Sequence, residues 1–360
     1  MKTLALGEVV ELAYGKALKA QDRTGGDIPV VGSSGVVGGH STGITDGPTI
    51  VVGRKGSIGS VTWIGGPAWP IDTAYYVKPK REDLDARWTY WLLRSLPLAS
   101  MNKSAAVPGL NRDDVYRLSI TLPSPYKQRR IAAILDHTDA LRAKRRQVLA
   151  HLDSLTQSIF HDMFGGEHWG AMLSDFAEIQ TGPFGSLLHQ EDYITDGVPV
   201  INPMHIKEGQ LQPDTEFCVG EAKAASLTRF QLQQGDLVLG RRGEMGRAGV
   251  AGARHVGMIC GTGSLILRPR GVDSEFLHAV VTSPRMKAHL ERSSLGSTLP
   301  NLNSTIVKAS PAPKVPDHKQ TQFVSRVREV KRMHKVARQA ATADDELFAS
   351  LQSRAFRGEL

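Results

Sequence analysis

The stretch from Pro123 to Gly165 reads PSPYKQRRIAAILDHTDALRAKRRQVLAHLDSLTQSIFHDMFG, and this chain of 360 residues contains a second, related copy of it. The second copy runs from Val315 to Leu360 and reads VPDHKQTQFVSRVREVKRMHKVARQAATADDELFASLQSRAFRGEL. A constant offset of 192 residues aligns the two, so that Leu155 matches Leu347. Internal repetition is a strong indicator of architecture, and it predicts two comparable halves.

Both copies are predicted to be long helices. Each follows prolines, which end the preceding segment, and the first copy has no Gly or Pro between Pro125 and Gly165. Apolar residues recur at a 3-4 spacing, which is typical of a coiled coil. A helix of this kind would be about 55 Å long at 1.5 Å per residue. The alternative is two ordinary amphipathic helices on separate domains. The predicted seam comprises Ile131, Ile134, Leu141, Val148, Leu152 and Leu155, with Val327, Val330, Leu347 and Leu351 from the second copy.

The regions before the two helices share an internal plan. TIVVGRKGSIG (Thr49–Gly59) corresponds to DLVLGRRGEMG (Asp236–Gly246), and the second region has loop insertions mostly between residues 183 and 235. Short β-rich runs bounded by glycines alternate with helical segments, which predicts a mixed α/β fold. We expect two similar α/β globules and two long repeated helices that form an antiparallel coiled coil. The predicted boundaries are 1–122 and 166–315 for the globules, and 123–165 and 316–360 for the helices.

Composition excludes several classes of protein. Hydrophobic residues make up 41% of the chain and charged residues 22%, as in soluble globular proteins. No run of 18 apolar residues predicts a membrane span, and the N-terminal stretch is too charged for a signal peptide. The two cysteines, Cys218 and Cys260, form no CxxC motif, so a zinc site or a disulfide framework is not expected. The expected location is the cytoplasm.

Positive charge is concentrated on the repeated helices. The net charge is +8, and the segments 127–147 and 314–339 carry +5 and +6, so the remainder of the chain is slightly acidic. A basic stripe of this kind suits a polyanion such as the DNA backbone. It is equally consistent with the solvated outer face of a coiled coil.

A strand followed by a glycine-rich basic loop occurs in both halves. Paired cations beside backbone N–H groups suit phosphate oxygens, and arginine can also bind guanine in a bidentate manner. One such loop alone would favour an ordinary turn, whereas the repetition favours nucleic-acid binding. It is not a P-loop, because no Gly-Lys-Ser/Thr closes it. The DNA-binding candidates are Arg54, Lys55, Ser57, Asn102, Lys103, Arg241, Arg242, Glu244, Arg247 and Arg292.

A second pair of polar segments precedes the last predicted strand of each globule. SAAVPGLN (Ser104–Asn111) corresponds to GSTLPNLN (Gly296–Asn303). Asn and Ser side chains can bind bases or phosphates. For Asn111 and Asn303 we favour the simpler interpretation that each asparagine bonds to its own backbone.

No catalytic or metal-binding constellation is predicted. The chain contains neither HExxH nor a plausible G-x-S-x-G elbow. Asn202-Pro203-Met204 superficially resembles the Asn-Pro-Pro-aromatic motif of adenine methyltransferases, but the second proline and the aromatic residue are absent. Gly261-Thr262-Gly263 lacks the third glycine of a dinucleotide-binding loop. We therefore assign no function to either segment from the sequence.

The duplicated order of globule and helix, with a G-R-x-G-x-x-G loop in each globule, resembles the specificity subunit of type I restriction-modification enzymes. The resemblance covers essentially the whole chain, and it is carried by residues 237–246, 296–303 and 123–128. Lys127-Gln128 and Lys319-Gln320 stand where the family usually has an acidic residue and glutamine. Each motif is loose alone, and their order and duplication make the match.

This resemblance implies a non-catalytic subunit that binds double-stranded DNA. Each globule would be a target recognition domain that reads one half of a split sequence, and the helices would set the spacer. Two modification subunits carrying S-adenosylmethionine would dock on the helices, and a restriction subunit would join where one is encoded. The alternative is a coiled-coil DNA-binding adaptor of a phage-defence complex that does not direct methylation. A nucleotide-dependent enzyme would need catalytic residues that the sequence lacks.

Overall fold

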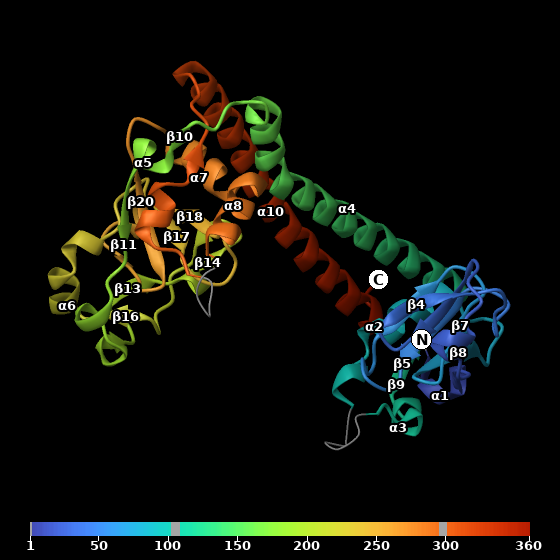
Figure 1. Cartoon of the computed structure of the whole chain (residues 1–360). Coiled ribbons are helices and arrows are strands. Elements are labelled where there is room, and N and C mark those ends of the chain that lie inside the picture. The colour runs from blue at the N-terminus through green and yellow to red at the C-terminus, as the bar shows by residue number, and fades with distance from the viewer. Residues whose placement is uncertain (1, 102–108, 295–300) are drawn as a thin grey trace. The chain divides into compact units, whose positions relative to one another are not determined.

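The structure is a computed structural model that describes residues 2–101, 109–294 and 301–360 (Figure 1). It divides into two compact units. Unit 1 comprises residues 1–147 and 338–360, and unit 2 comprises residues 148–337. Both repeated segments are helical, as predicted: α4 spans Pro125–Phe164 and α10 spans Asp317–Arg357. Each of these helices contributes one end to unit 1 and the other end to unit 2.

Unit 1 is built on a four-stranded antiparallel sheet with the order β2-β8-β5-β6. Its central strand β5 has the sequence TIVVG and is buried along its whole length, as expected for a β-branched run. Trp88 and Trp91 lie on α2 and are fully buried in the core of this unit, as their spacing predicts. The sheet comprises Val10–Tyr14 (β2), Ala74–Pro79 (β8), Thr49–Gly53 (β5) and Val61–Ile64 (β6), and α2 is Ala86–Ser95.

A smaller sheet and a strand pair complete unit 1. In the smaller sheet, β3 (Ile28–Gly32) pairs antiparallel with β4 (Gly35–His40) and parallel with β7 (Trp69–Pro70). The strand pair consists of β1 (Lys2–Ala5) and β9 (Ser119–Leu122), which leads into α4. Two short helices, α1 (Leu6–Val9) and α3 (Arg112–Tyr116), lie between these elements.

Unit 2 repeats this topology. Its main antiparallel sheet has the order β11-β20-β17-β18, and β13 pairs parallel with β19 as β3 does with β7. The predicted repetition of a mixed α/β plan is therefore confirmed. The strands are Ala177–Thr181 (β11), Ser264–Pro269 (β20), Leu237–Gly240 (β17), Ala248–Val250 (β18), Val198–Ile201 (β13) and Ile259–Cys260 (β19), with the pair Ala171–Met172 (β10) and Pro311–Ala312 (β21). The helices are Leu173–Phe176 (α5), Ser274–Thr282 (α7), Pro284–Ser294 (α8) and Ser304–Lys308 (α9).

The insertions of unit 2 lie between β11 and β17, where the sequence places them. They form short additional elements, some of which pair with β13. These elements are Tyr193–Ile194 (β12), Ile206–Lys207 (β14), Gln210–Leu211 (β15), Cys218–Val219 (β16) and Glu221–Ser226 (α6).

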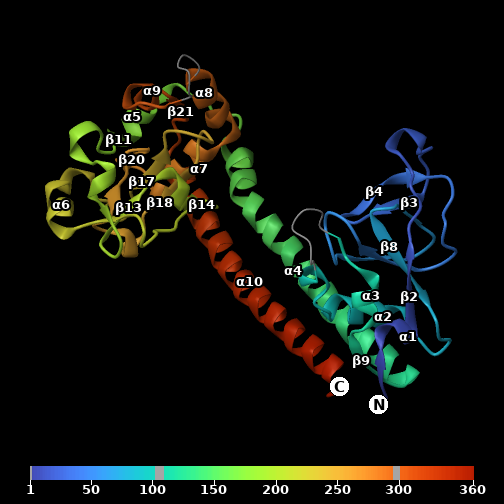
Figure 2. The same cartoon turned by 90° about the horizontal axis from the view of Figure 1, so that it is seen from below.

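The long helices pair in opposite directions within each unit (Figure 2). In unit 1, Ile131 near the start of α4 is buried in the same core as Phe348 near the end of α10. In unit 2, Phe164 at the end of α4 lies with its ring centroid 5.6 Å from that of Phe323 near the start of α10. Among the described residues, no helix has the length and apolar character that a membrane span requires.

The residues of the predicted seam differ in burial. Ile131, Val327 and Val330 are buried, and Ile134, Leu152, Leu155 and Leu351 are half-buried. Leu141, Val148 and Leu347 are 42%, 46% and 51% exposed.

The buried residue beside Leu347 is Phe348, and polar contacts also join the helices near these positions. In unit 1, Arg142 binds Asp345 at 2.6 Å and Arg145 binds Asp344 at 3.2 Å. In unit 2, His334 Nε2 lies 2.8 Å from an oxygen of Asp153.

Candidate nucleic-acid interface

The basic loop of unit 1 begins directly after β5 and is fixed by its own backbone. The Arg54 N–H donates to Thr73 O at 2.9 Å, and Arg54 O accepts a hydrogen bond of 2.9 Å from the Leu110 N–H. The Arg54 guanidinium lies over the ring of Tyr14, 5.1 Å from its centroid. Gly56 has a φ of +75°, a conformation that favours glycine, so the chain can reverse here. Lys55 and Ser57 are left exposed on the loop.

The loop of unit 2 follows β17 and has the same backbone scheme. The Arg241 N–H donates to Gly263 O at 2.9 Å, and Arg241 O accepts from the Leu302 N–H at 2.9 Å. Gly243, at the position of Gly56, has a φ of +79°. The repeated sequence motif therefore corresponds to a repeated loop geometry, in which the first basic residue is clamped and the second is exposed.

The clamped Arg241 is a structural residue. Its Nε donates to Leu302 O at 2.7 Å, and its Nη1 donates to Thr262 O at 3.3 Å. Burial lowers the pKa of its guanidinium from the usual value. Arg242, the next residue, is exposed to solvent. Of this pair, Arg242 is the cation that a phosphate or a base edge could reach.

The acidic residue of this loop, Glu244, forms ion pairs with neighbouring cations. Glu244 accepts a hydrogen bond of 3.3 Å from Lys287 on α8, and Arg247 contacts it at 3.3 Å. The hydrogen bond from Lys287 holds the pKa of Glu244 below its usual range. Arg247 also donates to Pro203 O at 3.5 Å. Glu244 therefore stays charged beside two cations and orients them.

Comparison with known proteins finds sequences and a fold similar to those of this chain. Residues 1–151 match the family model described as type I restriction modification DNA specificity domain. The type I restriction enzyme EcoDI specificity subunit of Escherichia coli is 24% identical over 172 residues, which cover 46% of this chain and 38% of that relative. The EcoBI specificity subunit of E. coli is 22% identical over 354 aligned positions, which cover 86% of this chain and 73% of the relative.

A solved structure has the same fold. The crystal structure of the type I restriction-modification system S subunit from M. genitalium superposes with a TM-score of 0.65 at 15% identity, over 99% of this chain and 96% of that one. The chain is therefore similar in sequence and fold to type I specificity subunits. The match to the EcoDI relative spans less than two fifths of that relative's length.

Unit 1 has a cationic pocket beside its loop. It measures about 430 Å³ and is lined by Arg54, Lys55, Tyr14 and Arg112, among others. The Arg112 guanidinium lies 4.9 Å from the ring centroid of Tyr14, and burial raises the pKa of the neighbouring Tyr75 to about 12. Sequence reasoning missed Arg112 and Tyr14. The only available signal was that Arg112 directly follows the repeated Leu-Asn pair.

Of the remaining DNA-binding candidates, the structure describes Arg292. Arg292 is exposed in the last turn of α8, the helix that also carries Lys287. Asn102 and Lys103 lie outside the described residues, as do residues 104–108 and 296–300 of the two polar segments. Within the described part of the chain, no group of three or more His, Cys, Asp or Glu side chains is placed to hold a metal ion.

The two repeated asparagines bond to their own backbone. Asn111 Oδ1 accepts from the Asp113 N–H at 2.8 Å, and Asn303 Oδ1 accepts from the Ile306 N–H at 2.8 Å. Each side chain thereby caps the short helix that follows it, α3 or α9. The prediction that both asparagines act locally is confirmed.

Proposed function

We propose that this chain is the DNA-sequence-recognition subunit of a type I restriction-modification complex. Residues 1–122 and 166–315 would each be a target recognition domain that reads one half of a bipartite double-stranded target. The observation that carries the proposal is the duplicated loop. In both units an exposed cation, Lys55 or Arg242, follows a clamped arginine at the end of a buried strand.

The loop geometry suits DNA because one residue fixes the backbone and the next residue has a side chain that can contact the ligand. Clamping of Arg54 and Arg241 fixes the backbone, so the next side chain projects from a defined point. A preorganised cation loses less entropy on binding than one on a flexible loop. Phosphate contacts would position each unit, and contacts with base edges would specify the sequence. The two loops differ, Gly-Ser-Ile-Gly against Gly-Glu-Met-Gly, so we expect two different half-sites.

The helices supply the second part of the proposal. α4 and α10 would set the spacing between the half-sites and dock two modification subunits. Leu141, Val148 and Leu347 are apolar, exposed and on these helices, as a docking surface requires. The adenine methyl transfer, with its S-adenosylmethionine, would take place in the modification subunits, and a restriction subunit would cut where one is encoded. This chain would catalyse no reaction.

A methylation map of the host genome, with and without the gene, tests the proposal. Loss of N6-methyladenine from a split motif with a fixed gap on deletion would support it and would reveal both half-sites. An unchanged map in cells that express the protein would reject it in favour of a DNA-binding adaptor. The exchange of residues 166–315 with those of a second specificity subunit should then alter only one half of the motif.

A further inference from the structure

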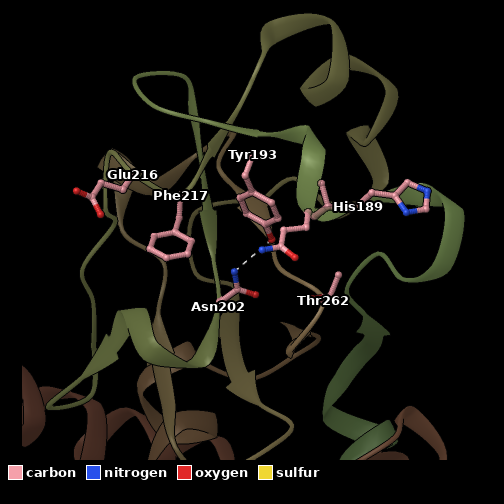
Figure 3. A pocket seen from close by; sticks show the side chains of 8 residues that line it. His189, Tyr193, Asn202, Glu216, Phe217 and Thr262 are labelled. Carbon is pink, nitrogen blue, oxygen red and sulfur yellow. Dashed lines mark hydrogen bonds between the residues drawn. The ribbon is translucent and has the colours of Figure 1, made fainter.

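Unit 2 contains a pocket of about 450 Å³ that lies among its inserted segments (Figure 3). Its half-buried walls are Tyr193, Asn202, Phe217 and Thr262, and the exposed His189 and Glu216 lie at its rim. The pocket does not overlap the basic loop of unit 2. Its volume is within the range of sites that hold a small ligand.

The aromatic side chains of the pocket pack against each other and against His205. The rings of Tyr193 and Phe217 form an edge-to-face pair with centroids 6.2 Å apart. The buried His205 lies with its ring centroid 5.2 Å from that of Phe217, and its Nδ1 accepts the Asn202 N–H at 3.1 Å. In an edge-to-face pair one ring uses only its edge, so its faces remain available. Aromatic faces of this kind stack on nucleobases.

Asn202 contributes a carboxamide that is only loosely engaged. Its Nδ2 donates to the Tyr193 hydroxyl at 3.4 Å, which is long for a hydrogen bond. A Cβ added at Gly261 would lie 2.1 Å from Asn202 Oδ1, so the glycine makes room for the amide. The parallel pairing of β13 with β19, which aligns Ile201 with Cys260, brings the two segments together. Asn-Pro-Met and Gly-Thr-Gly, to which the sequence assigned no function, therefore meet at one pocket.

We propose that this pocket binds one nucleobase, adenine or cytosine, unstacked from the DNA that unit 2 holds. In both bases the exocyclic amino group lies beside a hydrogen-bond-accepting ring nitrogen on the Watson–Crick edge. A carboxamide offers a donor beside an acceptor, which matches an amino group beside a ring nitrogen. The ring faces of Tyr193 or Phe217 would replace the stacking that the base loses. The inference rests on the proposed function, because the base would come from the DNA that the chain recognises. It assigns the insertion of unit 2 a role that unit 1 does not share.

Two measurements on the full chain test the inference. The first titrates it with dAMP, dCMP, dGMP and dTMP by calorimetry. We expect dAMP or dCMP to bind about tenfold more tightly than the other two, since a good bidentate pair discriminates by about this factor. Asn202→Ala and Gly261→Ala should abolish the preference. Tyr193→Phe, which keeps the ring, and Met204→Ala, which changes an exposed side chain beside Asn202, should retain it.

The second measurement uses a duplex that carries the mapped target. Each pair in the half read by unit 2 is replaced by a mismatch that leaves the A or C in place. Because a mismatch removes part of the cost of unpairing, binding should tighten about tenfold at one position. Asn202→Ala should lose this gain, and Met204→Ala should keep it.

The outcomes separate this inference from the proposed function. A mononucleotide preference without any mismatch effect would assign the pocket to a free nucleotide and overturn the unstacked base. If the chain directs methylation to a split sequence but shows neither effect, the pocket inference fails and the proposed function stands. If the chain recognises no split sequence, the proposed function fails, and the source of the ligand in DNA fails with it.

Discussion

The Leu302 N–H donates a hydrogen bond of 2.9 Å to Arg241 O, and in the other unit the Leu110 N–H donates one of the same length to Arg54 O. The partners are distant in sequence, so each bond closes the basic loop against the second repeated segment of its own unit. In unit 2, the bond from Arg241 Nε to Leu302 O, at 2.7 Å, adds a second clamp. The first arginine of each motif therefore builds the loop, and the residue after it is free to bind.

Arg242→Ala should weaken DNA binding by the second unit without changing stability. The side chain is exposed, and surface substitutions typically change the free energy of unfolding by less than about 0.5 kcal/mol. If Arg242 contacts a phosphate, the salt dependence of binding should fall by about one unit of slope. Binding measured by fluorescence anisotropy between low and moderate salt checks this.

Two variants control for this substitution. Arg332→Ala removes an exposed cation of α10 that is paired with Glu329, and it should leave DNA binding unchanged. Arg241→Ala should lower stability, because the backbone oxygens of Leu302 and Thr262 lose their donor. If the salt dependence of DNA binding had the same slope for Arg242→Ala and the wild type, Arg242 would not contact a DNA phosphate.

Gln128→Ala should destabilise the chain more than Gln320→Ala, although the two glutamines are repeat partners. Gln128 is fully buried, accepts from the Asp85 N–H at 2.7 Å and donates to Pro123 O at 3.0 Å and Asp83 O at 3.1 Å. Gln320 donates to Val315 O at 2.9 Å. Since each buried polar group left unsatisfied costs about 1–3 kcal/mol, the expected losses are about 3 and about 1 kcal/mol.

Urea unfolding measures this difference. Tryptophan fluorescence reports mainly on unit 1, which contains four of the five tryptophans, and hydrogen exchange reports on unit 2. Tyr126→Ala, in the same turn as Gln128 but 70% exposed, is the matched control and should be nearly neutral. Equal losses for the two glutamine variants would mean that the additional bonds of Gln128 contribute no net stability.

Much of the fold could be predicted from local sequence. The β-branched run of β5 between glycines, and the absence of Gly and Pro within α4, determine the element types with little help from tertiary contacts. The internal repeat strengthened the prediction, because the strand followed by a glycine-rich basic loop occurs in both halves of the chain. Capping by Asn111 and Asn303 was predictable for the same reason, since the bond partners lie within three residues.

The candidate site was harder to predict because its contacts are distant in sequence. The burial of Arg241 depends on Leu302, and the pocket at Asn202 depends on a strand pairing with residues near Cys260. Periodicity also could not reveal that Leu347 is exposed. The 3-4 spacing is interrupted between Ala337 and Leu347, and the adjacent Phe348 takes the buried position against the core of unit 1.

Unit 2 should lose stability as the pH falls below about 6.5. His278 on α7 is half-buried by solvent exposure, and its Nε2 lies 3.2 Å from Ala248 O. Desolvation lowers its pKa, with a further contribution from Lys331. The folded state therefore holds the neutral imidazole, while the unfolded chain takes up a proton near pH 6.5. The contribution of His278 is complete above pH 6.5 and is lost as the pH falls towards the lower folded pKa, with a slope of at most about 1.4 kcal/mol per pH unit.

Hydrogen exchange of unit 2 between pH 7.5 and 5.5 measures this loss. His278→Gln keeps an N–H donor but does not titrate, so its stability should depend less steeply on pH than that of the wild type. Some dependence should remain, because burial also lowers the pKa of His205, His255 and His289. If the slope were identical with and without His278, its neutral state in the folded chain would be wrong.

Leu347→Glu combined with Leu141→Glu should prevent the modification subunits from docking while the chain remains folded. Both side chains belong to unit 1 and are about half exposed, so a charge at these positions meets water and costs little stability. At an apolar interface the same charge would be desolvated without a partner, which weakens binding strongly. Co-purification of the modification subunit with the tagged chain is the measurement.

Ile131→Ala is the contrast, because that side chain is buried and its truncation should cost about 2–5 kcal/mol of stability. If the modification subunit still co-purified with the double variant, the docking surface would not include Leu141 and Leu347. If the double variant did not fold, the two leucines would belong to a buried seam.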